Sequence, residues 1–154
     1  MHDNTTLIYL ECPIQKDIGA VWKLLSTKEG LKSFFAPDID VNFKVGGKFE
    51  ILFDMDQPAG LRGSEGMIIL NIEPESMLSF TWNAPPSIPD IRAQMTVVHI
   101  YLEPTEDGCL LKLINSGYGK SESWQKARRY FIRAWGDIVL PRLKKVAEEG
   151  THSF

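Results

Sequence analysis

Hydrophobic and polar residues alternate through the middle of the chain, and this two-residue period predicts antiparallel strands. In residues 48–55, KFEILFDM, the side chains of Phe49, Ile51 and Phe53 fall on one face, and mostly polar side chains fall on the other. Comparable runs follow at 66–74, 77–83, 92–104 and 109–116, and Asp107–Gly108 supplies a turn between the last two. We therefore expect about six strands between residues 39 and 116.

The N-terminal region predicts one strand followed by two short helices. Residues 5–12, TTLIYLEC, are β-branched and apolar, which is typical of a strand. Asp17 stands where a helix N-cap is expected, ahead of apolar residues at helical spacing. The sequence STKE at 26–29 has the form of a capping box and predicts a second helix, which Pro37 ends.

Residues 121–149 predict one long amphipathic helix. Apolar residues recur every three or four positions from Trp124 to Val146, and Pro141 is expected to kink the helix or shift its apolar stripe. Together the elements predict a single α+β domain over residues 1–154, with its core at about 5–149. A curved antiparallel sheet around a helix leaves space between the two, and such spaces bind ligands.

Two adjacent glycines, Gly46 and Gly47, precede the strand at 48–55. A phosphate-binding glycine loop needs a helix directly after it, so that backbone N–H groups point at the anion. Because a strand follows here and the Walker spacing is absent, we expect no nucleotide site. The glycines are interpreted as a source of positive φ or a bulge where the chain turns into the strand.

Composition and charge exclude further classes of function. The net charge is −3 over 154 residues, which gives no electrostatic basis for binding nucleic acid or an anionic membrane. The basic residues within 126–133 are interpreted as the solvated face of a helix. No segment reaches the length of a membrane span and the N-terminus does not resemble a signal peptide, so we expect a cytoplasmic protein.

Candidates for chemistry are few. Cys12 and Cys109 lie in separate apolar runs and predict buried free thiols, and no residue cluster has metal-ligand spacing, so we expect neither metal nor cofactor. His99 alternates with apolar residues and is expected to face away from the cavity. Asp54 and Asp56 are close in sequence but stand among turn residues. No catalytic constellation can be assembled, which favours a non-catalytic protein.

Five segments, in order, resemble one family. They are AVWKLLSTKEGLKSFFAP at 20–37, VGGKFEI at 45–51, GMIILNIEPESMLSFTW at 66–82, LEPTEDGCLLKLINSGY at 102–118 and the closing helix. Their order and spacing are similar to those of the activator of heat-shock-protein-90 ATPase homologue branch of the START-like (SRPBCC) superfamily, and the resemblance covers nearly the whole chain.

This resemblance implies the helix-grip fold. In that fold a curved six- to seven-stranded antiparallel sheet wraps around a long C-terminal helix and a deep cavity, with two short helices after the first strand. Two departures bear on the cavity: the family usually has Trp at the position of Phe34, and its final helix often carries Gly-Trp where this chain reads Ala134–Trp135–Gly136. Both changes are expected near the core.

Eight residues are candidates for ligand binding on the inner face of the sheet and the adjoining helices. The aromatic candidates are Phe34, Phe53, Phe80, Trp82, Tyr118 and Trp124. The polar candidates are Arg92 and Gln94, which share a face with Thr96 if residues 92–104 are one strand. A polar side chain in an apolar cavity needs a partner, which a ligand carboxylate or carbonyl could supply. The alternatives are plain core for the aromatic residues, and a solvated sheet rim for the polar ones and for Asn115.

Two loops are expected near the mouth of the cavity. Residues 83–92, NAPPSIPDIR, are too long for a tight hairpin, and they form either a lid or a surface loop pinned by Ile88 and Ile91. Residues 56–66 are the counterpart between the preceding strands, where Arg62 could face the same mouth.

The outer face of the sheet is unusually apolar at Ile69, Met95, Val97 and Tyr101. We interpret it as a partner surface, for which a second copy of the chain is one candidate. Coverage by loops is the alternative.

The leading hypothesis for function is non-catalytic binding of a small hydrophobic or amphipathic molecule between the sheet and the long helix. The resemblance alone implies a second hypothesis, stimulation of the heat-shock-protein-90 ATPase as a co-chaperone in the stress response. Eukaryotic activators add an N-terminal domain for which this sequence has no room, so this hypothesis ranks below the first. A third hypothesis is a START-like cyclase or hydrolase, for which the sequence offers only Arg92, Asn115, Glu65 and Asp54 as cavity-facing groups.

Overall fold

The computed structural model describes residues 6–150 and confirms the α+β helix-grip architecture. The chain begins with one strand and two short helices, continues with six strands interrupted by one further short helix, and ends with a long helical segment. The strands are β1 (Leu7–Ile14), β2 (Asp38–Val41), β3 (Phe49–Leu52), β4 (Ile69–Glu73), β5 (Met77–Trp82), β6 (Thr96–Thr105) and β7 (Gly108–Ser116). The helices are α1 (Ile18–Leu25), α2 (Lys28–Phe34), α3 (Pro89–Arg92), α4 (Glu122–Arg133), the π-helix η1 (Ala134–Val139) and α5 (Leu140–Glu149).

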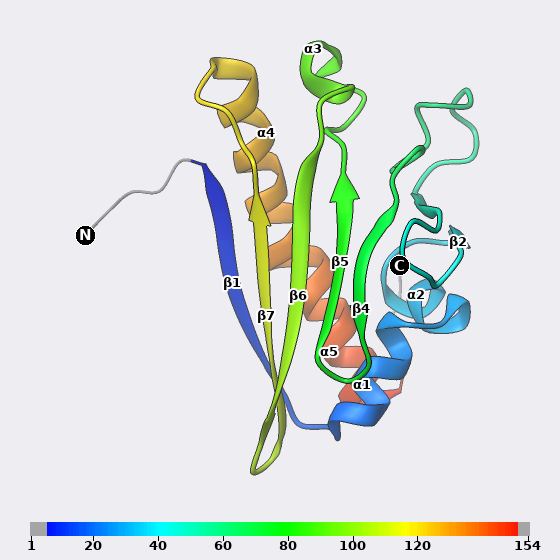
Figure 1. The fold of residues 1–154 in the computed structure, drawn as a ribbon, viewed down its shortest axis with the longest axis vertical. Helices are drawn as coiled ribbons and strands as arrows, with labels where there is room; N and C mark the ends of the chain where they lie inside the picture. Colours follow the sequence, from blue (N-terminus) through cyan, green and yellow to red (C-terminus); the bar gives the residue numbers. More distant parts are fainter. Residues whose placement is uncertain (1–5, 151–154) are drawn as a thin grey trace.

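The strands form two antiparallel sheets rather than one. The larger has the order β1-β7-β6-β5-β4, and β2 pairs with β3 in the smaller. Two single bridges, Lys48 with Ile68 and Leu52 with Gly63, connect β3 to the region around β4. In Figure 1 the C-terminal helical segment, coloured orange to red, crosses one side of the larger sheet. The core therefore lies between this segment and the inner face of the sheet.

The alternation in the sequence correctly predicts the inner face. The inner-face side chains of β5, β6 and β7, at every second position, are buried as expected, although Ser79 and Thr81 on the other face of β5 are buried too. The inner-face residues include Leu78, Phe80, Trp82, Val98, Ile100, Leu111 and Leu113. Phe49 and Ile51 of β3 are also buried, and the rings of Phe49 and Phe80 stack with centroids 4.1 Å apart.

The helix caps follow the local sequence, with one shift. Asp17 caps α1, its Oδ2 accepting from the N–H of Ala20 at 3.0 Å. Thr27, rather than Ser26, caps α2 by accepting from the N–H of Gly30 at 3.0 Å. Ser26 instead ends α1, and its backbone N–H donates to the carbonyl of Trp22. The N-cap therefore lies one residue later than predicted, and because Gly30 rather than Glu29 stands at the third helical position, the predicted capping box does not form.

The expected long C-terminal helix contains a wide turn. The π-helix η1 separates α4 from α5, and the N–H of Leu140 donates to the carbonyl of Trp135, five residues back. Pro141 follows directly in the first turn of α5, where its missing N–H is tolerated. A π turn adds a residue to the helix and so shifts the apolar stripe, as was expected near Pro141.

Gly46 and Gly47 form a tight turn between β2 and β3. Gly46 has φ of 81°, and a Cβ on Gly47 would lie 2.1 Å from the carbonyl oxygen of Asn42. The pair exchanges backbone hydrogen bonds with Ile69: the N–H of Gly46 donates to the Ile69 carbonyl, and the N–H of Ile69 donates to the Gly47 carbonyl, each at 2.8 Å. The double glycine thus anchors the smaller sheet to β4, as the positive-φ interpretation expected.

Two predicted strand registers are wrong. The strand expected from residue 92 begins at Thr96, because residues 89–92 form the short helix α3, and Arg92 therefore does not share a strand face with Thr96. Ile69 was expected on the outer face but is fully buried opposite Phe80. The neighbours of Ile69, Ile68 and Leu70, are the exposed ones. An irregularity between Ile69 and Asn71 breaks the simple alternation of β4.

Within residues 6–150, no helix has the length and apolar character needed to cross a membrane.

Candidate functional site

Two adjoining cavities open between the C-terminal helical segment and the ends of β3 and β5. The first has a volume of about 430 Å³ and the second about 240 Å³. Phe53, Trp82, Tyr130 and Phe131 line both, so the two form one continuous cleft. The first volume alone lies in the range of pockets that bind small molecules.

Three kinds of element build this cleft. Phe53 follows β3 and Trp82 ends β5, so sheet ends supply one wall. The loops at 54–63 and 83–87 extend that wall around the first cavity. Tyr130 and Phe131 of α4 supply the opposite wall, and the second cavity continues along η1 past Ala134, Trp135, Ile138 and Val139.

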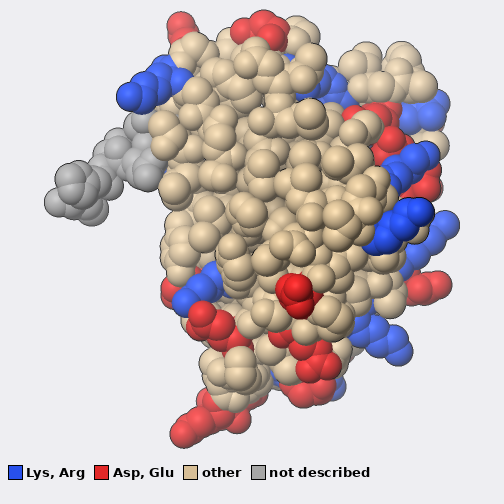
Figure 2. Space-filling view, in the orientation of Figure 1, with Lys and Arg blue, Asp and Glu red and all other residues tan. Residues whose placement is uncertain are grey.

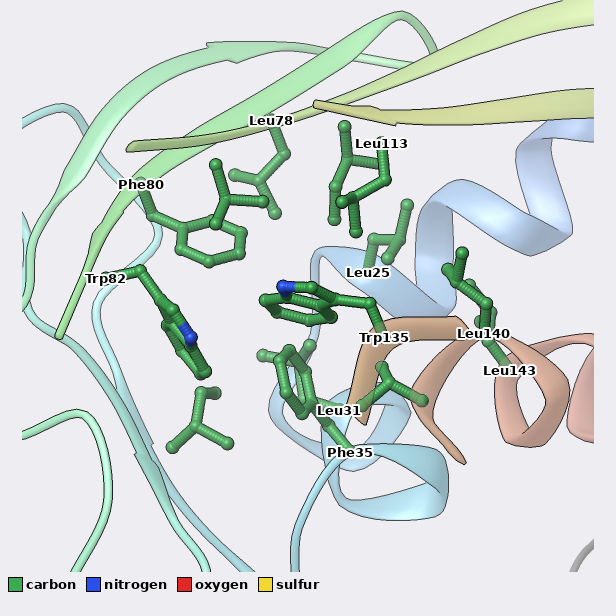
Figure 3. Packing of buried hydrophobic residues seen from close by; sticks show 14 of the residues in the cluster. Leu25, Leu31, Phe35, Leu78, Phe80, Trp82, Leu113, Trp135, Leu140 and Leu143 are labelled. Carbon is green, nitrogen blue, oxygen red and sulfur yellow. The ribbon is translucent and has the colours of Figure 1, made fainter. Parts of the chain in front are cut away.

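Aromatic rings surround the second cavity and pack on one another. Trp82 lies at ring-centroid distances of 5.2 Å from Trp135, 5.8 Å from Phe35 and 6.1 Å from Phe131. Figure 3 shows Phe35, Trp82 and Trp135 with their rings turned toward one another, and Phe80 next to Trp82. Tilted and edge-on contacts of this kind favour a rigid, apolar wall.

The indole nitrogen of Trp82 has no hydrogen-bond partner. Among the described residues, this nitrogen is the only buried side-chain nitrogen or oxygen for which no hydrogen-bond partner is found. Trp82 is 4% exposed and lines both cavities. Figure 3 shows this nitrogen on the ring edge that faces Trp135 and Phe35. Buried donors are nearly always paired in folded proteins, so this unpaired N–H is an exception within the aromatic wall.

Arg92 holds two loops together at the wall of the first cavity. Its guanidinium donates to the carbonyl of Ala84 in one loop, and to the carbonyls of Gly60 at 2.7 Å and Gly63 at 2.8 Å in the other. Glu65 lies 3.5 Å from the same guanidinium. Burial lowers the pKa of Arg92, while Glu65 opposes that shift. The partners of Arg92 are thus protein groups.

Glu65 organises the loop at 56–66 from within. Its Oε1 accepts from the N–H groups of Arg62 at 2.8 Å and Gly63 at 2.7 Å, and its Oε2 accepts from the N–H of Gly60. Ser64, fully buried, accepts from the N–H of Ile51 and donates to the carbonyl of Phe49. The loop is therefore fixed both to itself and to β3. Arg62 lines the first cavity, as expected for this loop.

The loop at 83–92 is pinned by its apolar residues. Ile88 and Ile91 are both 4% exposed, and Asp90 accepts a hydrogen bond of 2.5 Å from the hydroxyl of Ser123 at the start of α4. These contacts match the expected pinned loop. Residues 83–87 at the same time form part of the cavity wall.

A buried polar network lies beyond the aromatic wall. Asn115 Oδ1 accepts from the hydroxyl of Tyr118 at 2.6 Å and from the indole nitrogen of Trp135 at 3.2 Å. Asn115 Nδ2 donates to Thr96 Oγ1 at 3.0 Å and to the carbonyl of Val97 at 3.1 Å. Burial raises the pKa of Tyr118 far above its usual value. Asn115, which was expected to face a ligand or water, is instead fully buried and bonded within the protein.

The structure divides the eight candidate residues into two groups. Phe53, Trp82 and Arg92 line the cleft. The other five are not among the lining residues. Phe34 and Phe80 lie in the core, Tyr118 belongs to the polar network, Trp124 packs edge-on against Tyr118, and Gln94 is exposed beside α3. Contact between any of the eight and a ligand stays a prediction.

Sequence reasoning missed several residues of the cleft. Phe35, Tyr130, Phe131 and Ala134 line it, as do Ala84 and Pro85. Phe131 lies within the apolar stripe of the predicted helix, and Phe35 at the end of the second short helix, and both positions are equally typical of core residues. Tyr130 lies outside that stripe and is 45% exposed. Its position next to Phe131 in the chain is the only sequence signal that it could line the mouth.

Groups suited to catalysis are sparse around the cleft. Asp54 lines the first cavity, and its carboxylate accepts from the N–H of Asp56 and the side chain of Gln57. Among residues 6–150, no three His, Cys, Asp or Glu side chains are arranged to hold a metal ion. Cys12 and Cys109 are free and buried, as predicted, and burial raises the pKa of both thiols.

A family model matches most of this chain. The family is described as "Activator of Hsp90 ATPase homolog 1-like protein", and the match spans residues 17–148. The chain belongs to this family. The match includes α1, every strand from β2 to β7 and almost all of the C-terminal helical segment, and so contains every element of the cleft.

Solved structures share the family fold at low sequence identity. The Aha1 dimer from Colwellia psychrerythraea has a TM-score of 0.73 and 17% identity, with 95% of this chain and 98% of that one covered. Protein NE0264 from Nitrosomonas europaea has a TM-score of 0.71 and 19% identity, over 96% and 97%. Protein MLL2253 from Mesorhizobium loti has a TM-score of 0.69 and 24% identity, over 91% and 95%. No curated protein matches the chain significantly. These likenesses concern the fold alone.

Proposed function

We propose that this protein binds a small hydrophobic or amphipathic molecule in the cleft between its sheet ends and C-terminal helical segment, without transforming it. The observation that carries the proposal is a continuous cleft with an aromatic wall, made of two cavities of about 430 Å³ and about 240 Å³. Apolar walls with a few placed polar groups are the usual composition of small-molecule sites. The first cavity also has a polar margin that includes Asp54, Gln57 and Arg62, which suits an amphipathic ligand.

Non-catalytic binding fits the side chains around the cleft. Arg92 is engaged by three backbone carbonyls and Glu65, and Glu65 is engaged by backbone N–H groups. Both side chains therefore stabilise the loops through these hydrogen bonds and are not free to transfer a proton. A general acid or base needs a free titratable group within hydrogen-bond reach of the reacting atom.

A fluorescence titration tests this proposal. N-phenyl-1-naphthylamine is uncharged and becomes strongly fluorescent in apolar sites, so binding to the cleft should raise its emission. Ala134→Phe would place a ring at the half-buried wall of the second cavity and should weaken binding at least tenfold. Ala93→Phe, at an exposed position beside α3, is the matched control and should bind like the wild type. Equal affinity in all three proteins would place the probe elsewhere and contradict the proposal.

A second proposal concerns the outer face of the larger sheet, for which a second copy of this chain is the expected partner. Tyr9, Ile114, His99 and Ser79 are opposed in register across β1, β7, β6 and β5. In Figure 2, which has the orientation of Figure 1, this face has a broad uncharged area with charges mainly around its margin. Its exposed apolar residues include Tyr9, Ile68, Leu70 and Met95. Large uncharged surfaces of this kind favour association.

The similar Colwellia protein is described as a dimer, which supports this second proposal. Sedimentation analysis over a range of concentrations tests it. The wild type should form dimers, and Leu70→Glu should shift the equilibrium to monomer by placing a charge on the exposed sheet face. Leu61→Glu, at an exposed position in the loop at 56–66, is the control. A wild type that stays monomeric at high micromolar concentration would contradict a dimer through this face.

A further inference from the structure

We infer that the ligand of the cleft is an amphipathic anion whose carboxylate is bound by the guanidinium of Arg62. This inference rests on the proposed binding function, and it specifies the charge of the ligand and the way it lies in the cleft. The carboxylate occupies the first cavity, and the apolar part of the molecule extends into the second.

The loop at 56–66 fixes the position of Arg62 at the wall of the first cavity. The N–H of Arg62 donates to Glu65 Oε1 at 2.8 Å, and its carbonyl accepts from the N–H of Phe53 at 2.8 Å. Its side-chain Nε donates to the carbonyl of Gln57, also at 2.8 Å. Arg62 and Gln57 line the first cavity, while Phe53 lines both. These bonds therefore place Arg62 directly across from a residue that the two cavities share.

The guanidinium of Arg62 retains donors for a ligand. An arginine side chain has five N–H donors, and within residues 6–150 the bond from Nε to Gln57 is the only hydrogen bond or ion pair that this one makes. The two terminal nitrogens carry the other four donors. The side chain is half-buried at the cavity, so these nitrogens can meet a molecule that enters it. Two parallel N–H donors match the two oxygens of a carboxylate.

The other two arginines of the cleft are less suited to this task. The guanidinium of Arg92 already donates to the carbonyls of two loops, and Glu65, 3.5 Å away, offsets its charge. Arg142 lines the second cavity, where most of the described lining residues are apolar. Arg62 instead shares the first cavity with further polar side chains, such as that of Gln57, which can hydrate a charged head group.

The charges around the cleft favour an anion over a cation. Among the described residues that line the two cavities, three are arginines and one is a carboxylate, Asp54. Glu65 offsets only one of the arginines, Arg92. Both oxygens of Asp54 already accept hydrogen bonds, Oδ1 from the N–H of Asp56 and Oδ2 from the side chain of Gln57. An ammonium group in the cleft would therefore meet more like charges than opposite ones.

The apolar part of the ligand has a continuous path away from Arg62. Phe53, Trp82 and Phe131 line both cavities, and the second cavity continues along η1 past Ile138 and Val139. Burial of an alkyl chain or an aromatic ring against these side chains is favourable, whereas burial of a carboxylate there is not. A molecule with a carboxylate at one end and an apolar body satisfies both parts of the cleft.

Three probes with the same linear alkyl chain test this inference. Decanoate, 1-decanol and decylammonium differ in the charge of the head group at neutral pH, and each is used below its micelle concentration to displace N-phenyl-1-naphthylamine. Carboxylates and alcohols also differ in their affinity for water, so each probe is compared between protein variants. Arg62→Met keeps the apolar stem and removes the guanidinium. Arg129→Met makes the same change on the exposed side of α4, outside the cleft lining, and is the control.

Arg62→Met should weaken the binding of decanoate about tenfold, as expected when a hydrogen-bonded charge is lost, and should change that of 1-decanol less than about twofold. Arg129→Met should bind every probe like the wild type. If Arg62→Met leaves decanoate unchanged, or weakens 1-decanol as much, the inference is overturned while the proposed function stands. A wild type that prefers decylammonium to decanoate would also overturn it. If N-phenyl-1-naphthylamine itself does not bind in the cleft, both fail.

A second variant keeps the inference testable if Arg62→Met does not fold. Asp54→Asn removes the carboxylate that lines the same cavity and leaves Arg62 in place. It should strengthen the binding of decanoate about twofold, weaken that of decylammonium and leave 1-decanol unchanged, because only the charged probes respond to the lost charge. An unchanged affinity for decanoate in Asp54→Asn would then overturn the inference.

Discussion

Trp135 Nε1 donates a 3.2 Å hydrogen bond to Asn115 Oδ1, and this bond joins the π-helix η1 to strand β7. The same oxygen accepts the hydroxyl of Tyr118. Trp135 also forms part of the wall of the second cavity. This hydrogen bond therefore helps to hold that wall in place against β7.

Replacing Asn115 by Leu should strongly destabilise the fold. Leu has a similar volume but cannot accept from Trp135 and Tyr118, so two buried donors lose their partner. Each unsatisfied buried donor costs about 1–3 kcal/mol, so we expect a loss of about 3 kcal/mol in the free energy of unfolding. Urea denaturation measures it. Asn71→Leu, at an exposed position of β4, should change stability by less than about 1 kcal/mol. Similar effects at both positions would contradict a structural role for the network.

Tyr118 should make stability depend on pH in alkaline solution. Burial raises the pKa of its hydroxyl in the folded protein, while the unfolded chain ionises near a pH of about 10. The folded state therefore retains a proton that the unfolded state loses, and stability falls as pH rises above that value by about 1.4 kcal/mol per pH unit.

The variant Tyr118→Phe isolates this effect. At pH 7 it should lose about 1–2 kcal/mol with the hydrogen bond to Asn115. At pH 11 the difference from the wild type should be smaller by about 1.4 kcal/mol, because Phe does not ionise. Urea midpoints at both pH values give the comparison. A difference that stays constant between pH 7 and pH 11 would rule out the proton retained by Tyr118.

Removing the guanidinium of Arg92 should loosen the two loops that border the first cavity. Arg92→Met keeps the apolar stem but loses the donors to Ala84, Gly60 and Gly63. Hydrogen exchange at residues 57–66 and 83–88 should accelerate at least tenfold, and stability should fall by about 2 kcal/mol. Arg129→Met, on the exposed side of α4, is the control. Unchanged exchange in Arg92→Met would contradict the role of this side chain.

The thiols of Cys12 and Cys109 should react slowly in the native protein. Both are buried, and burial raises the pKa of each thiol, so little thiolate is present at neutral pH. A disulfide reagent at pH 8 should label them at least a hundredfold more slowly than it labels the protein in 6 M guanidinium chloride. Immediate labelling of two thiols in the folded protein would show that the core opens readily.

The fold was largely predictable because its signals are local and periodic. Alternation placed Phe80, Trp82 and Val98 on the inner face, and Asp17 marked the start of α1. The predicted strand registers were wrong where a local irregularity interrupts the two-residue period. Ile69 follows the bridge between Lys48 and Ile68 and precedes the shift in β4, so its face cannot be read from alternation alone.

The cleft was only partly predictable, because its walls combine residues that share no sequence pattern. Phe53 and Trp82 could be found from strand ends, but Phe131 has the spacing of any core residue. Arg92 was assigned to the cavity for the wrong structural reason. It lies in a short helix started by Pro89, and its partners are carbonyls about thirty residues earlier in the chain as well as Ala84. Such distant backbone contacts leave no periodic trace in the sequence.

Native mass spectrometry of the protein as purified tests the central claim, ligand binding in the cleft, most directly. Mild ionisation preserves bound molecules, and spectra after denaturation and extraction identify what is released. We expect a co-purifying mass on the wild type and on Ala93→Phe, but not on Ala134→Phe, whose added ring fills the second cavity. The same adduct retained in Ala134→Phe would contradict a binding site in this cleft.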